Sequence, residues 1–190
     1  MYNNYWIHLL TGGISISNEV IVSTYSDGKL YFAVAVKDGK ILKATLPKAD
    51  EESVLDEIST GYTSFKLTDE YKQYAKDVCM AYYGKNMRFN ASIPNKDDFK
   101  SKVLQEVAKI PYGEIRTYKQ ISESIGTNAY RAVGTAIGRN PLPIIIPCHR
   151  VVKSDFTTLW QGIIIGSGFL PIAVPTALYA LVPMDSEICL

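Results

Sequence analysis

The stretch TYKQISESIGTNAYRAVGTAIGRN, residues 117–140, decides the fold of this chain. Thr117 and Gln120 stand three positions apart, which is the spacing of a capping box and predicts that a helix begins here. The Gly126-Thr127-Asn128 tripeptide breaks that helix, and a second helix follows until Asn140-Pro141 ends it. Two short helices joined by a three-residue turn that contains glycine predict a helix-turn-helix.

The second helix has two chemically different faces. Apolar residues at helical spacing predict a core face that consists of Ala129, Ala132, Val133, Ala136 and Ile137. The opposite face carries Arg131, Gly134, Thr135, Gly138 and Arg139. A glycine inside a helix costs about 1 kcal/mol relative to alanine. Two glycines on a solvent face therefore indicate that another molecule approaches the backbone closely, and the arginines indicate a phosphate backbone. Tight packing against a neighbouring helix of the same chain is the alternative explanation.

The stretch PLPIIIPCHRVV, residues 141–152, follows the helix-turn-helix. Three isoleucines between prolines predict a buried, extended segment that places Cys148 beside His149 and Arg150. A thiol becomes nucleophilic as its thiolate, which nearby cationic and imidazole groups favour. For a single cysteine, an inert position in the hydrophobic core is the alternative.

The residues before the helix-turn-helix predict a small antiparallel sheet with helices. Three strands are expected over 20–26, 29–37 and 40–47, with Asp-Gly turns between them, and an earlier strand over 5–10. Helices are expected over 50–59 and 68–83, and a further helix is expected to begin at Asn95 and to bury Phe99, Val103, Leu104 and Val107. The predicted fold class is therefore α+β. We expect domains at 1–92 and 93–155, and an atypical apolar segment at 156–190.

Composition excludes several classes of protein. A chain of 190 residues with 47% apolar residues and a net charge of +1 is neither disordered nor collagen-like, and it forms one or two compact domains. Its three cysteines lie far apart, which argues against a disulfide framework and a zinc site. The N-terminus lacks the features of a signal peptide, so a cytoplasmic location is expected. Residues 100–155 carry nine Lys/Arg against four Asp/Glu, so the positive charge is concentrated in this segment.

The strings IPYGEIRTY, YRAVGTAIGRNP and PIIIPCHRVV, in this order and spacing, resemble the O6-alkylguanine-DNA alkyltransferase family (methylated-DNA–protein-cysteine methyltransferases). The resemblance is specific from about Phe99 to Ser154. It is looser over residues 1–92, where the family has a ribonuclease H-like α+β domain. The resemblance implies a DNA-repair protein that transfers an alkyl group once, stoichiometrically, from guanine to its own cysteine. It implies no metal and no dissociable cofactor.

The same resemblance implies roles for individual residues. Cys148 would accept the alkyl group, His149 would act through a water as the base, and Tyr118 would donate a proton toward the guanine. Asn140 would occupy the hinge before the active-site strand, and the carbonyls of Cys148 and Val151 would bind the guanine amino group. The helix that carries Arg131, Ala132, Gly134, Thr135 and Arg139 would lie in the minor groove of duplex DNA. Arg131 would fill the gap left by the flipped nucleotide. A monomer without membrane contact is expected.

The last part of the chain departs from the family pattern. Residues 156–184 contain no charged residue, and the family's G-Y-x-G-G loop is absent. None of Asp155, Asp185 and Glu187 matches the family's final glutamate. An altered terminus, a divergent lid and a membrane span remain open, although Pro171 and Pro175 interrupt a span. An altered terminus predicts slow or absent transfer. A non-catalytic lesion-binding or regulatory protein and a thiol hydrolase are the other functional alternatives.

Overall fold

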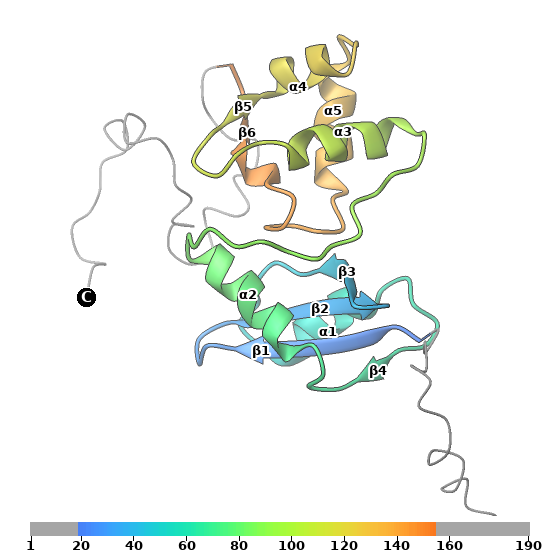
Figure 1. Ribbon diagram of the computed structural model, residues 1–190, viewed down its shortest axis with the longest axis vertical. Helices are drawn as coiled ribbons and strands as arrows, with labels where there is room; N and C mark the ends of the chain where they lie inside the picture. Colours follow the sequence, from blue (N-terminus) through green and yellow to red (C-terminus); the bar gives the residue numbers. More distant parts are fainter. Residues whose placement is uncertain (1–18, 155–190) are drawn as a thin grey trace, which may run out of the picture.

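The computed structural model describes residues 19–154. Its elements form a sheet with two helices and a group of three further helices, arranged as Figure 1 shows. The sheet has the strand order β3-β2-β1-β4. Its strands are β1 (Ile21–Ser26), β2 (Tyr31–Lys37), β3 (Lys40–Ala44) and β4 (Lys66–Leu67). The first three form the predicted antiparallel meander. The prediction of a purely antiparallel sheet was wrong, because β4 pairs in parallel with β1.

Helices cover both faces of the sheet. The central strand β2 alternates between two apolar clusters, as a strand buried on both sides must. Phe32, Val34 and Val36 pack with α2 (Lys72–Tyr82), whereas Ala33 and Ala35 pack with α1 (Glu51–Ser59). Helix α1 begins where predicted, because the Asp50 carboxylate accepts a hydrogen bond from the backbone N–H of Ser53 at 2.8 Å.

Helix α2 begins at Lys72 and not at Thr68 as predicted. The backbone N–H of Thr68 donates to the carbonyl of Val22 at 3.0 Å, so this residue continues the edge of the sheet. The buried Ser23 hydroxyl donates to the Thr68 carbonyl at 2.6 Å and accepts from the backbone N–H of Tyr71 at 3.1 Å. The helix therefore starts only after the chain has left β4.

The third helix, α3 (Phe99–Ala108), differs from its prediction in two ways. Its N-cap is Asp98 and not Asn95, because the Asp98 carboxylate accepts the Ser101 backbone N–H at 2.8 Å. Val103, Leu104 and Val107 are fully buried as predicted. The prediction that Phe99 is buried was wrong, since its side chain opens the first turn and remains 38% exposed.

Helices α4 (Tyr118–Ser124) and α5 (Tyr130–Gly138) form the predicted helix-turn-helix. The capping box is present: the Gln120 side chain accepts from Thr117 N at 2.7 Å, and Gln120 N donates to the Thr117 hydroxyl at 3.1 Å. Helix α5 packs against its neighbours through the buried side chains of Val133, Ala136 and Ile137. The prediction that Ala129 and Ala132 face the core was wrong, because both are exposed at the start of the helix.

A shared apolar cluster joins the two groups of elements. It contains sheet residues such as Phe32 and Ile41 together with helical residues such as Leu104 and Ile137. At this junction the backbone N–H of Ala44 in β3 donates to the carbonyl of Pro141 at 3.0 Å. Between residues 19 and 154 the structure has no helix that is long and apolar enough to cross a membrane. The strand predicted over 5–10 and the segment 156–190 lie outside the described residues.

Candidate active site

The chain between α5 and Cys148 is a folded loop. Asn140 supports it with both side-chain atoms: Oδ1 accepts the Leu142 backbone N–H at 2.9 Å, and Nδ2 donates to the Ile146 carbonyl at 3.3 Å. Ile146 N also donates to the Leu142 carbonyl at 2.8 Å. The loop is buried as predicted, but the prediction of an extended segment was wrong. Its prolines lack the N–H groups that a strand needs, and Ile144 has a φ of +72°.

Cys148 lies at the start of a 3₁₀ turn, Cys148–Arg150, that leads into strand β6 (Val151–Val152). Strand β6 pairs in parallel with β5 (Arg116–Thr117), which immediately precedes α4. This pairing brings Tyr118, the first residue of α4, to the region of Cys148, although the two are 30 positions apart in sequence. Both side chains are buried, with 7% and 1% of their surface exposed.

Two opposing influences act on the pKa of the Cys148 thiol. Burial raises the pKa of the thiol, while a hydrogen bond from the Asn140 side chain and the backbone amides of His149 and Ile144 counteract part of that rise. The pKa remains above its ordinary value, so the resting group at neutral pH is a thiol. A base is therefore needed to generate the nucleophile.

The pKa values of Tyr118 and His149 determine which of the two side chains carries a proton at neutral pH. Burial raises the pKa of Tyr118 to about 12, and the nearby Cys148 adds to the rise, so the phenol keeps its proton at neutral pH. Burial, assisted by the positive charge of Arg150, lowers the pKa of His149 to about 4. His149 is therefore neutral at pH 7 and free to accept a proton.

The depressed pKa of His149 predicts an acid-sensitive fold. Between pH 6.5 and about 4 the unfolded chain binds a proton that the folded chain does not, so stability must fall as pH falls through this window. We expect the wild-type chain to lose about 2 kcal/mol more unfolding free energy than His149→Gln between pH 7 and about pH 4.5. Urea unfolding of both proteins at both pH values measures this difference. Equal losses would contradict the buried, neutral state of His149.

The outer face of α5 is open to solvent. Arg131, Ala132, Thr135 and Arg139 are exposed there, and Gly134 is partly buried. Tyr130, with 42% of its surface exposed, stands beside Arg131. A Cβ atom added at Gly138 would meet nothing within 4 Å. Packing within the described residues therefore does not explain this glycine, which favours the approach of an external molecule.

Gly138 provides a test of that approach. Gly138→Ala should not destabilise the fold, because the added methyl group enters open space and alanine is the better helix former. If DNA approaches the helix backbone here, the same methyl group should weaken duplex binding severalfold. Thermal unfolding and duplex titration of the variant measure the two effects. Unchanged duplex affinity would argue that DNA does not contact this end of α5.

Three features of the site escaped the sequence analysis. Nothing in the sequence predicts a left-handed backbone at Ile144, because branched side chains rarely adopt it. The guanidinium of Arg150 lies 5.0 Å from the centre of the Tyr112 ring, and its Nη1 donates to the Pro111 carbonyl at 2.9 Å. The Tyr112 hydroxyl in turn donates to the carbonyl of Gly84 at the end of α2. A cation in an otherwise apolar run was the available signal for Arg150.

Comparison with known proteins places this arrangement in a family. Residues 98–162 match the family model described as 6-O-methylguanine DNA methyltransferase, DNA binding domain. A methylated-DNA–protein-cysteine methyltransferase of Archaeoglobus fulgidus is 38% identical over 128 residues, which span 66% of this chain and 75% of that protein. The chain belongs to the methylated-DNA–protein-cysteine methyltransferase family. A second member of the family, from Metallosphaera sedula, is 40% identical over 63% of this chain and 70% of its own length.

Solved structures of methyltransferases share the fold. The structure of Mycobacterium tuberculosis OGT in complex with DNA aligns with a TM-score of 0.59 and 26% identity, over 78% of this chain and 84% of that one. An O6-methylguanine DNA methyltransferase of Methanococcus jannaschii aligns with a TM-score of 0.54 over 88% and 99% of the two chains, and at 21% identity it supports the fold alone. The α+β class predicted from the sequence is confirmed.

Proposed function

We propose that this protein repairs DNA by transferring the alkyl group of O6-alkylguanine to the sulfur of Cys148, once per molecule. One observation carries the assignment of the site: the β5–β6 pairing brings a buried thiol, Cys148, to a buried phenol, Tyr118. The base, His149, follows the thiol directly. Family membership supports the enzyme class, methylated-DNA–[protein]-cysteine S-methyltransferase.

In the proposed reaction, residues of this chain accept the thiol proton, form the new bond to carbon and protonate the leaving guanine. His149 takes the Cys148 proton through a water, and the sulfur attacks the alkyl carbon as the bond from that carbon to guanine O6 breaks. The electron pair of the broken bond stays with the guanine, which receives a proton from Tyr118. Asn140 contributes by holding the loop before Cys148 and by hydrogen bonding to its sulfur. The backbone carbonyls of Cys148 and Val151 are proposed to accept the guanine amino group.

The proposed DNA contact is the outer face of α5. Arginines with small residues between them suit the minor groove, where backbone contacts dominate. The lesion cannot be reached inside a stacked duplex, so the base must be flipped at a cost of a few kcal/mol, and Arg131 is proposed to fill the gap. Ala132, Gly134, Thr135 and Arg139 are proposed to lie along the groove. A monomer acting in the cytoplasm, with a domain boundary near residue 93, completes the proposal.

A direct test is incubation with a duplex oligonucleotide that contains O6-methylguanine, followed by peptide mass analysis. We expect one methyl increment per chain on the Cys148 peptide, because the thioether is stable and the sulfur is consumed. The same digest should show Cys79 unmodified, since burial raises its pKa to about 11 and no base is assigned to it. Tight lesion binding without any methyl increment would instead support a non-catalytic lesion-binding protein.

A further inference from the structure

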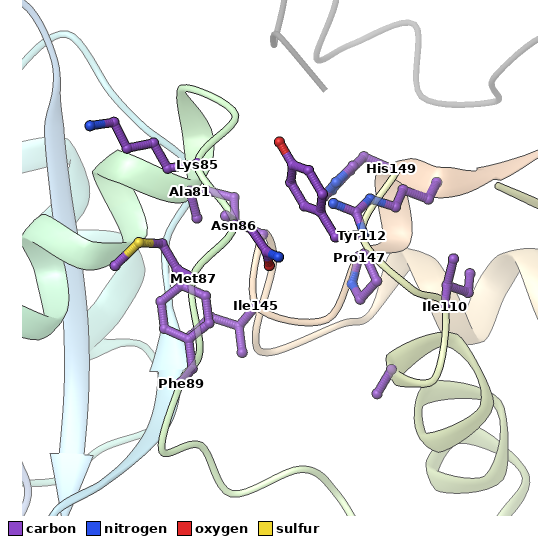
Figure 2. A pocket seen from close by; sticks show the side chains of 13 residues that line it. Ala81, Lys85, Asn86, Met87, Phe89, Ile110, Tyr112, Ile145, Pro147 and His149 are labelled. Carbon is purple, nitrogen blue, oxygen red and sulfur yellow. The ribbon is translucent and has the colours of Figure 1, made fainter. Parts of the chain in front are cut away.

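A cavity of about 190 Å³ lies beside the active-site turn, between the end of α2 and the loop before Cys148 (Figure 2). Met87 and Phe89 form one wall, and Ile145 contributes a further apolar surface. Figure 2 shows Asn86 directed from the α2 side toward Tyr112 and Pro147. His149 and Arg150 also line the cavity, so its wall is shared with the proposed catalytic base.

Arg150 has an incomplete set of partners. Its Nη1 donates to the Pro111 carbonyl, and its guanidinium lies against the Tyr112 ring. Its Nε is buried and has no hydrogen-bond partner among the residues that the structure describes. None of the ion pairs formed within residues 19–154 includes Arg150. A partly buried charge of this kind is normally paired, because an unpaired one loses its hydration without compensation.

The lining of the cavity and the charge of Arg150 together indicate which class of ligand fits there. A guanidinium presents a planar fork of donors that matches a carboxylate. Lys85 and Asn86 add polar groups to the lining, beside the apolar side chains of Met87, Phe89 and Ile145. An apolar cavity of about 150 Å³ is large enough for benzene, so this one accommodates a ring or a short chain. We propose that the cavity binds a small organic carboxylate, with its charge at Arg150.

Such a ligand would affect the transfer of the Cys148 proton to His149. When His149 accepts the Cys148 proton it becomes an imidazolium beside Arg150, and the repulsion between these two cations opposes the step. A carboxylate in the shared cavity offsets that repulsion and favours the proton transfer. Only this consequence rests on the proposed function. Binding itself is a property of the cavity and is measured without DNA.

The test compares benzoate with benzamide, a neutral molecule of almost the same shape, by calorimetric titration and by saturation-transfer NMR. We expect saturable binding of benzoate and at least about tenfold weaker binding of benzamide, because charge-assisted hydrogen bonds are about twice as strong as neutral ones. Arg150→Lys keeps the charge but removes the fork and should weaken benzoate binding. Met87→Trp places a larger side chain in the lining of the cavity and should abolish binding.

Two outcomes overturn the proposal. Equal affinity for benzoate and benzamide, or no binding of either, means that the cavity has no anion site. Unchanged benzoate affinity in a folded Met87→Trp variant means that benzoate binds elsewhere. A methyl-transfer assay with and without benzoate then measures the effect on His149, where a severalfold faster reaction is expected. Benzoate binding by a protein that transfers no methyl group would leave the site established and the proposed function refuted.

Discussion

Cys148→Ala should abolish methyl transfer completely while leaving affinity for duplex DNA within about twofold of the wild type. The variant removes the only atom proposed to accept the alkyl group. Cys148 exposes 1% of its surface and therefore contributes almost nothing to the outer face of the protein. Transfer is measured as the methyl increment of the intact chain after incubation with excess lesion duplex. Affinity is measured by titration of the same duplex.

Cys79→Ala is the matched control for this experiment. Cys79 is a second buried, free cysteine, with 4% of its surface exposed, and it lies in α2, where it packs with residues of the sheet. We expect this variant to retain stoichiometric transfer, since nothing in the proposed reaction involves it. A methyl increment that persists in Cys148→Ala and disappears in Cys79→Ala would move the acceptor to α2 and overturn the proposed site.

Arg131→Ala should slow repair in duplex DNA by about tenfold to a hundredfold, because the side chain is proposed to offset the few kcal/mol needed to extrude a base. The reaction with the same lesion as a free base should stay close to the wild-type rate, since a free base needs no extrusion. Single-turnover rates on both substrates measure the two effects. Equal losses on both substrates would remove the assignment of Arg131 as the residue that fills the gap.

Two further variants separate shape from charge at this position. Arg131→Lys keeps the positive charge, and Arg139→Ala removes an equal charge from the other end of the same exposed face. If electrostatic attraction to phosphates is the whole effect, Arg139→Ala should match Arg131→Ala and both losses should shrink as salt is added. If insertion into the stack matters, the loss in Arg131→Ala should exceed that in Arg139→Ala at every salt concentration.

The parts of the fold that depend on local signals were predictable from the sequence. Asp-Gly turns fixed the meander, and Thr117 with Gln120 fixed the start of α4. Features that depend on distant partners were not predictable. The parallel pairing of β4 needs the edge of β1, and the choice of Asp98 over Asn95 as N-cap depends on where Ser101 lies. Ala132 was assigned to the wrong face because only the later turns of α5 pack against the core.

The candidate site also combines features that could be predicted from the sequence with features that could not. The Cys-His pair and the arginine face could be picked out by residue type and by resemblance to a family. The structure adds that β5 and β6 bring Tyr118 to Cys148, and that the Asn140 side chain supports the loop between them. It also adds the Arg150–Tyr112 contact, which joins two segments 38 positions apart in sequence.

The tight enclosure of the Cys148 sulfur has a consequence for the molecule after it has reacted. A methyl group added there enters a close-packed interior, and one extra carbon in such a place typically costs about 1–3 kcal/mol. Strands β5 and β6 pair over only two residues each, so few backbone hydrogen bonds hold this part of the structure together. The protein methylated at Cys148 should therefore unfold locally around this residue first. The same covalent bond would then complete the repair and destabilise the protein that carried it out.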